Sequence, residues 1–109
     1  MAGAAAILVM TQLPDRTAAT ELARALVEAR IAACVTIGAS VDSLYHWRGQ
    51  IETAAEVPVL IKTRAERYGD VEAAIRARHP YELPEIVAVP IVAGFAPYLQ
   101  WITDEAPGK

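Results

Sequence analysis

The sequence contains a single cysteine, Cys34, and no cluster of lysine and arginine anywhere along its length. One cysteine cannot form a disulfide within the chain, so we expect a reducing compartment, the cytoplasm. The net charge of −3 argues against binding to nucleic-acid phosphates. No apolar run approaches the roughly 20 residues that a membrane-spanning helix needs. We therefore expect neither a nucleic-acid partner nor a membrane.

Enzyme motifs are also missing. There is no glycine-rich phosphate loop, no Gly-x-Gly-x-x-Gly and no Cys-x-x-Cys. Cys34 lies in an apolar string with no histidine, lysine or arginine near it in the sequence, which is typical of a small buried side chain and not of a reactive thiolate. We predict that the protein is not an enzyme and uses no organic cofactor.

The apolar residues predict alternating strands and helices in a single domain over residues 1–109. Asp15 is a good cap for the first helix, and the run 63–66 (Thr-Arg-Ala-Glu) matches a capping box for the second, which Pro80 ends. The predicted elements are a strand over 5–11, a helix over 16–30, a strand over 32–37, a hairpin over 41–63 with its turn at 48–50, a helix after 63–66, a strand over 85–92 and a short helix over 97–102.

This order predicts an α+β fold of the ferredoxin-like β-α-β-β-α-β type, with one antiparallel sheet and both helices on a single face. The opposite face is then left as an uncovered apolar surface, which favours an oligomer. The hairpin over 41–63 is too long for a domain of this size to support. Pro58 lacks a donor in its return limb, so we expect an edge or a bulge there and a tip that leaves the sheet.

The segment 79–85 (His-Pro-Tyr-Glu-Leu-Pro-Glu) is the densest group of polar side chains in the sequence. Its two prolines, Pro80 and Pro84, restrict the backbone on both sides. A rigid loop that displays an imidazole, a phenol and two carboxylates is a plausible binding surface. The alternative is that Pro80 only ends a helix and Pro84 only starts a strand.

Metal ligation is weakly supported by the residues themselves. The soft or borderline donors are few and have no spacing that closes a site within one chain. A site could form where subunits meet, with glutamates as hard oxygen ligands; alternatively, these carboxylates are solvated charges. The soft or borderline donors are Met1, Met10, Cys34, His46 and His79, and the glutamates are Glu52, Glu56, Glu82 and Glu85.

From about residue 6 to residue 102 the chain resembles the CutA family of divalent-cation tolerance proteins. The segments that carry the resemblance are 11–15 (Thr-x-x-Pro-Asp), 32–35 (Ala-Ala-Cys-Val), 43–52 (Ser-Leu-Tyr-His-Trp-Arg-Gly-Gln-Ile-Glu), 56–57, 61–63 (Ile-Lys-Thr), 79–86 (His-Pro-Tyr-x-x-Pro-Glu-Ile) and 98–101 (Tyr-Leu-x-Trp). The resemblance implies a homotrimer with a ferredoxin-like core similar to the PII signalling proteins, in which long hairpins join the subunits.

The resemblance also implies a function, namely divalent-cation tolerance by binding or responding to metal ions such as copper. Family members described as copper binders carry a cysteine before the threonine of the first motif and two histidines before Pro-Tyr. Met10, Arg78 and His79 occupy these positions here, so the implied ligands are His79 and Met10, and only His79 is unchanged. Met10 could serve Cu(I) as a soft thioether.

Two other functions stay open. In one, clefts between subunits hold a small metabolite or a partner's loop, as the likeness to PII proteins suggests. The residues that would line such a cleft are Trp47, Lys62, Tyr81 and Glu85. In the other, the trimer is an interaction scaffold without a ligand.

Overall fold

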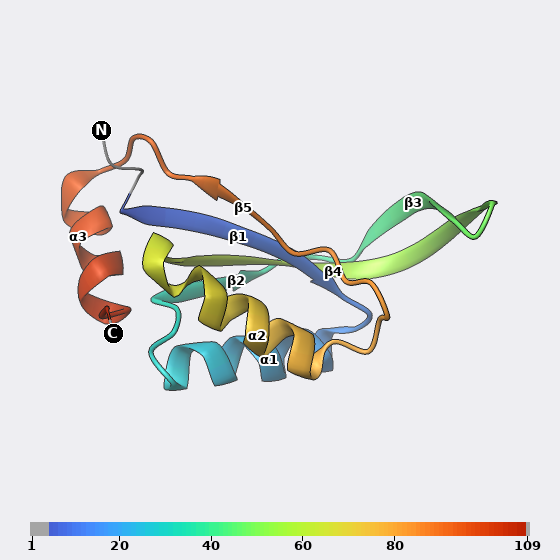
Figure 1. The fold of residues 1–109 in the computed structure, drawn as a ribbon, viewed down its shortest axis with the longest axis horizontal. Coiled ribbons are helices and arrows are strands. Elements are labelled where there is room, and N and C mark those ends of the chain that lie inside the picture. The colour runs from blue at the N-terminus through green and yellow to red at the C-terminus, as the bar shows by residue number, and fades with distance from the viewer. Residues whose placement is uncertain (1–4, 109) are drawn as a thin grey trace.

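The computed structural model describes residues 5–108 and has an α+β fold, from which a long hairpin extends beyond one end of the sheet (Figure 1). The predicted order of elements is confirmed, and α3 follows at the C-terminal end. The elements are β1 (Ala6–Leu13), α1 (Arg16–Glu28), β2 (Cys34–Ile37), β3 (Val41–Trp47), β4 (Gln50–Arg64), a 3-10 turn (Ala65–Arg67), α2 (Tyr68–Arg78), β5 (Val87–Pro90) and α3 (Ala96–Glu105).

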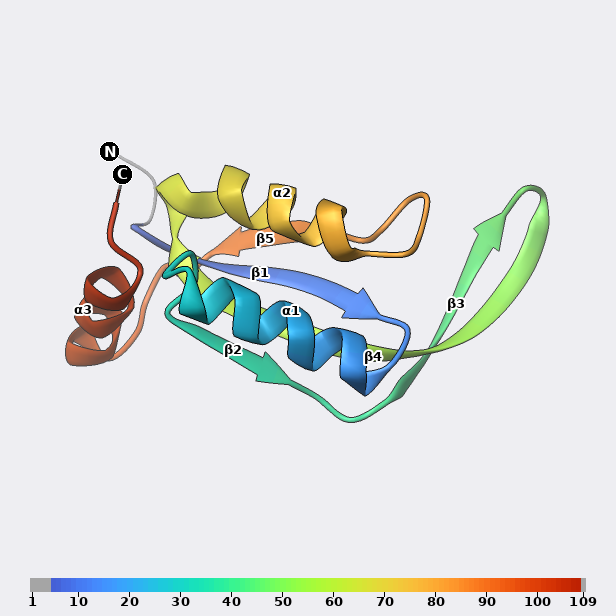
Figure 2. The same cartoon turned by 90° about the horizontal axis from the view of Figure 1, so that it is seen from below.

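The sheet has the strand order β2-β4-β1-β5, and all of its pairs are antiparallel. β1 is central, since Val9 lies opposite Ile61 of β4 and opposite Ala88 of β5. Successive side chains of a strand point to opposite faces. One face of β1 and β4 is therefore buried under α1 and α2, which lie on the same side of the sheet (Figure 2). This is the predicted ferredoxin-like arrangement.

Helix α1 begins as predicted and ends earlier than predicted. The backbone N–H of Ala18 donates to Asp15 Oδ1 at 2.8 Å, which caps the helix. Leu22 and Leu26 are fully buried against the sheet. The helix ends at Glu28 and not at Arg30, because Arg30 has a left-handed φ of 58° that cannot continue an α-helix. None of the helices described in residues 5–108 has the length and apolar character needed to cross a bilayer.

The predicted capping box over 63–66 is wrong. Thr63 is still part of β4, and its hydroxyl donates to the carbonyl of Ile31 instead of capping a helix. The strand continues because Arg64 still pairs with Ala6 at the end of the ladder with β1. Glu66 pairs with Arg64 at 3.2 Å. Long-range pairing therefore overrides the local capping pattern.

The hairpin leaves the sheet at a bulge beside Pro58. Ile37 is opposite Val59, and Val41 is opposite Glu56, so residues 38–40 face only positions 57 and 58. Gly38 N–H donates to the Pro58 carbonyl at 2.9 Å. The nitrogen of a strand residue points to the same neighbour as its carbonyl, so the missing donor of Pro58 faces the bulge. The predicted bulge is confirmed, and the β3–β4 ribbon beyond it projects from the body (Figure 1).

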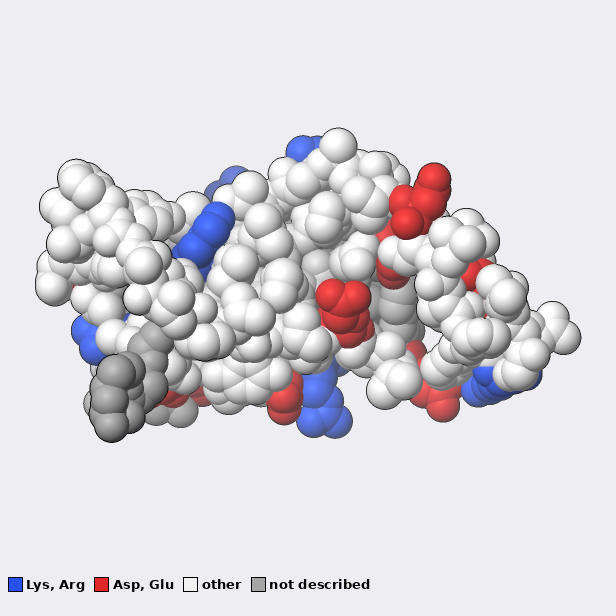
Figure 3. Space-filling model, turned by 90° about the horizontal axis from the view of Figure 1, so that it is seen from above, with Lys and Arg blue, Asp and Glu red and all other residues white. Residues whose placement is uncertain are grey.

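The face of the sheet away from α1 and α2 is apolar and only partly covered. Leu8 and Met10 of β1 lie there opposite Val89 and Val87 of β5, and Leu60 of β4 lies beside Met10. Val87 and Val89 are 46% and 43% exposed. The view onto this side shows few charged side chains over the body (Figure 3). The uncovered face that we predicted is therefore present in the chain.

Helix α3 closes one end of the sheet. Ile102 is fully buried and packs with Ala6 and Ala33. The Arg64 guanidinium donates to the carbonyl oxygens of Thr103 and Ala106, at 2.8 Å to each, which satisfies carbonyl groups at the end of the helix. Helix α3 does not cover the opposite end of the sheet, from which the hairpin emerges (Figure 1).

Candidate functional site

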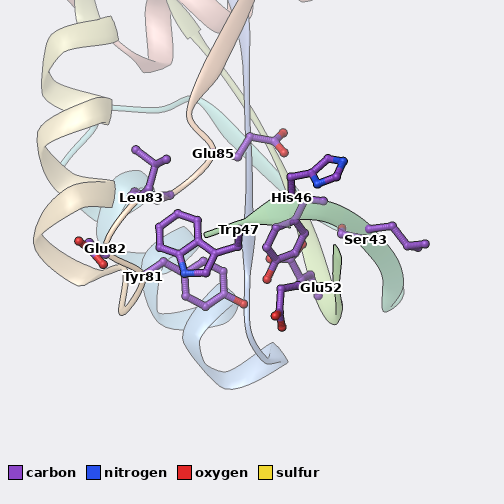
Figure 4. Close-up of a pocket in the computed structure, with 12 residues that line it drawn as sticks. Ser43, His46, Trp47, Glu52, Tyr81, Glu82, Leu83 and Glu85 are labelled. Carbon is purple, nitrogen blue, oxygen red and sulfur yellow. The ribbon is translucent and has the colours of Figure 1, made fainter. Parts of the chain in front are cut away.

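A cleft of about 900 Å³ lies between the hairpin and the loop that follows α2. Figure 4 shows that the rings of Trp47 and Tyr81 are turned toward the same space, while the His46 ring points away from both. The cleft is lined by Ser43, Leu44, Tyr45, His46 and Trp47 of β3, by Glu52 and Glu56 of β4, and by Tyr81, Glu82, Leu83, Pro84 and Glu85 of the loop.

Strand pairing positions the hairpin side of the cleft. Tyr45 is directly opposite Glu52, and Trp47 follows Tyr45 by two positions, so these three side chains lie on one side of the ribbon. Glu56 lies opposite Val41 where the ribbon joins the body and is only 8% exposed. A half-exposed ribbon therefore supplies two aromatic rings and two carboxylates to the cleft.

His79 positions the loop side of the cleft. Its Nε2 lies 2.6 Å from the Gln12 carbonyl oxygen, and its Nδ1 accepts from the Tyr81 backbone N–H at 3.2 Å. These partners require a neutral imidazole with its proton on Nε2. His79 is 8% exposed, and the centre of its ring lies 4.6 Å from the centre of the Tyr81 ring. In this arrangement neither ring nitrogen has a lone pair free for a metal ion.

Gln12 joins the two sides of the cleft, a role that was not predicted from the sequence. Its side-chain oxygen accepts from the Ser43 hydroxyl at 3.5 Å, and its side-chain amide donates to Glu85 Oε1 at 3.3 Å. Its backbone carbonyl is the partner of His79. The only signal in the sequence is a polar residue that interrupts the apolar end of β1, so its partners could not have been deduced.

The cleft is strongly acidic. Four of its lining residues are glutamates, and none is lysine or arginine. Burial, the charge of Glu56 and the hydrogen bond to Glu56 raise the pKa of Tyr81, in that order of effect. In the space-filling view, carboxylates gather around the hollow between the body and the hairpin (Figure 3). The cleft therefore attracts positive charge.

One cation lies at the rim of the cleft. Arg48 Nη2 is 3.1 Å from Glu82 Oε2, and its guanidinium carbon lies 5.3 Å from the centre of the Trp47 ring. Arg48 and Gly49 form the hairpin turn, with φ values of 52° and 80°. The guanidinium thus bridges the two sides of the cleft at its mouth.

Within one chain, the structure brings together only some of the residues that we predicted for a cleft between subunits. Trp47, Tyr81 and Glu85 line it, but Lys62 does not. Lys62 lies on the uncovered face of the sheet, where its ammonium group donates to the Thr36 hydroxyl. Within one chain Lys62 cannot contribute to the cleft, so its predicted role requires a second copy.

Cys34 differs from the expectation in its surroundings. It is partly and not fully buried, and its Sγ lies 3.9 Å from Lys62 Nζ. Burial and the neighbouring Cys34 raise the pKa of Tyr98 from α3. The lysine was missed because it is 28 positions away in the sequence and adjacent only across the β2–β4 pair.

The described residues do not fit a metal ion within one chain. Across residues 5–108, no three or more His, Cys, Asp or Glu side chains are placed to hold one. Met10 lies on the uncovered face opposite Leu60, and both nitrogens of His79 have partners. Ligation by Met10 and His79 stays a prediction, and it requires His79 to give up a hydrogen bond.

Comparisons with known proteins agree on one family. A family model described as CutA1 divalent ion tolerance protein matches residues 7–105. A protein CutA homolog from Xenopus laevis is 40% identical over 86% of this chain, which spans 62% of that relative. A divalent-cation tolerance protein CutA from Thermus thermophilus is 38% identical, and the match covers 89% of this chain and 94% of that one.

The fold comparison gives the same result. The crystal structure of a stable CutA1 from the psychrotrophic bacterium Shewanella sp. SIB1 superposes with a TM-score of 0.94. Its sequence is 45% identical, and the match covers 98% of this chain and 100% of that one. The likeness therefore extends from the motifs to the complete arrangement of strands and helices.

Proposed function

This chain belongs to the CutA1 divalent ion tolerance protein family, and we propose that it serves cation tolerance as a homotrimeric binding module whose ligand site is the acidic cleft. The observation that carries the proposal is the lining of the cleft, which has four glutamates and neither lysine nor arginine. Carboxylate oxygens attract divalent cations and organic cations alike. The family's names describe tolerance of ions, so we propose no catalytic step.

The homotrimer is part of this proposal. It is supported by the uncovered apolar face of the sheet and by a hairpin that projects beyond its own domain. A cleft formed by a projecting hairpin and an exposed loop would lie at the seam between copies. Because one chain does not place enough ligands for a bare ion among its described residues, a bound metal ion would be shared with a neighbouring copy.

Calorimetric titration of the purified protein with Cu(II) and Zn(II) tests the proposal. We expect saturable uptake that Glu85→Gln weakens by about fivefold, because one charge contributes about 1 kcal/mol at a solvated site. Glu56→Gln should weaken uptake at least as much, since Glu56 is only 8% exposed and charges interact more strongly away from water. Glu21→Gln is the matched control, since Glu21 is exposed on α1 away from the cleft. Absence of uptake, or uptake that neither cleft variant changes, contradicts the proposal.

A second candidate is a PII-like module for a small ligand. The observation that favours it is the aromatic part of the same cleft, Tyr45, Trp47 and Tyr81, which an inorganic ion would not need. A thermal-shift screen of small metabolites tests this candidate. If no compound raises the melting temperature, the third function, a scaffold without a ligand, gains support.

A further inference from the structure

We propose that the cleft binds a small organic cation, a primary amine or guanidinium compound, which contacts the Trp47 ring and the carboxylates of Glu82 and Glu56. The inference rests on the proposed function in one respect, because it uses the same cleft as the ligand site. It goes further in assigning the ligand's chemical class and in giving Arg48 the role of an internal competitor.

Arg48 shows which chemistry the mouth of the cleft accepts. Its guanidinium lies 5.3 Å from the centre of the Trp47 ring and 3.1 Å from a Glu82 oxygen. An aromatic face and a carboxylate together form a typical recognition site for an organic cation. Both members of the ion pair are more than 70% exposed, so the pair is weak and a ligand can displace it.

The interior of the cleft has negative charge that no lining cation neutralises. Glu56 is 8% exposed, and the neighbour that hydrogen-bonds to it there is the neutral phenol of Tyr81. A carboxylate removed from water is stabilised by a positively charged partner. Among the lining residues described, none is lysine or arginine, so that partner would come from a ligand.

The shape and donors of the cleft favour an organic cation over a bare metal ion. Its volume of about 900 Å³ lies in the range of pockets that hold small molecules. The described residues place no three ligating side chains around one point. The rings of Trp47 and Tyr81 instead present faces that attract ammonium and guanidinium groups. A suitable probe therefore carries a cation at each end, one for Glu82 at the mouth and one for Glu56 inside.

The test is a calorimetric titration with agmatine, which carries a guanidinium and an amine, and with neutral butanediol as the control compound. We expect saturable binding of agmatine and none of butanediol. Trp47→Leu and Glu82→Gln should each weaken binding by about fivefold or more, whereas Trp47→Phe, which keeps an aromatic face, should retain most of it. Glu82 is exposed, so its variant does not depend on folding of the core.

Arg48→Ala provides the decisive measurement. If Arg48 occupies the ligand's place, its removal should tighten agmatine binding by up to about fivefold, despite the loss of a neighbouring side chain. Arg24→Ala removes a similarly exposed ion pair on α1 and should change nothing. No agmatine binding, or weaker binding by the Arg48 variant, overturns the inference.

The outcomes separate the inference from the proposed function. Uptake of Cu(II) or Zn(II) that depends on Glu56, without agmatine binding, leaves the proposed function standing and overturns the inference. Agmatine binding that follows the expected variants, without metal uptake, supports the inference and contradicts the proposed function. If neither ligand binds, both proposals fall.

Discussion

Among single side chains, His79 holds the loop of the cleft against the end of β1. Its two ring nitrogens form hydrogen bonds with the Gln12 carbonyl and the Tyr81 backbone N–H, so each nitrogen of the neutral ring has a partner. Gln12 continues the connection through its side chain to Ser43 and Glu85. His79 therefore supports the site structurally, and its role as a metal ligand stays a prediction.

We expect His79→Ala to lower the free energy of unfolding by about 1–3 kcal/mol, because it leaves a part-buried carbonyl and a part-buried backbone N–H without their partner. Denaturant unfolding measures the difference in free energy between this variant and the wild type. The control is His46→Ala, an exposed position at which the change should stay within about 0.5 kcal/mol. If His79→Ala retains wild-type stability and abolishes metal uptake, the imidazole is a ligand and our structural assignment is wrong.

Among the elements, the hairpin depends most on local backbone geometry. Its turn uses left-handed φ values at both Arg48 and Gly49, which matches a type I′ turn and the right-handed twist of the strands. The bulge beside Pro58 then directs the ribbon away from the sheet. Turn and bulge together determine where the hairpin side of the cleft lies.

Two glycine substitutions should have opposite effects on stability. Gly49→Ala should destabilise the protein by about 1–2 kcal/mol, because Gly49 has a φ of 80° that alanine adopts only with strain. Gly69→Ala should stabilise it by up to about 1 kcal/mol, since Gly69 is in α2 and a methyl group added there meets no described neighbour within 4 Å beyond its own helix. Thermal or denaturant unfolding of both variants measures these shifts. Stabilisation by Gly49→Ala contradicts the left-handed geometry of the turn, and destabilisation by Gly69→Ala contradicts the free space beside α2.

For the protein as a whole, the hairpin makes the chain elongated. The principal extents are 44 × 29 × 23 Å, and the radius of gyration is 14.5 Å, whereas a domain of about 100 residues has a radius near 13 Å. The extra length is a ribbon with exposed Leu44 and Ile51, each 70% exposed. Together with the uncovered face, this is the physical basis for the proposed trimer.

We expect the wild-type protein to be a homotrimer in dilute solution, and Val89→Asp to dissociate it, because a charge on the uncovered face opposes burial against another copy. Val27→Asp on α1 is a matched control, since both valines are 43% exposed. Sedimentation velocity or native mass spectrometry measures the oligomeric state of the wild type and of both variants. A wild-type monomer, or equal dissociation by both variants, contradicts this role of the face.

The cytoplasmic location of the protein also stays a prediction.

Much of the fold could be predicted because its signals are local. Period-two and helical patterns identified the strands and helices, Asp15 marked the start of α1, and Pro58 marked the bulge. The capping box at Thr63 failed because pairing of β4 with β1 extends the strand through Arg64. The end of α1 was missed because nothing in the apolar pattern shows that Arg30 adopts a left-handed backbone.

The site depended on contacts between distant segments. Arg48 and Glu82 are 34 positions apart, and Gln12 and Glu85 are 73 apart, so no local pattern could place them together. The sequence was sufficient to identify the elements, their order, the family and the residues with suitable chemistry. Only the register of the sheet, the bulge and the packing of the loop could decide that Trp47 and Tyr81 share a cleft and that Lys62 lies elsewhere, because these follow from which backbone groups pair across the chain.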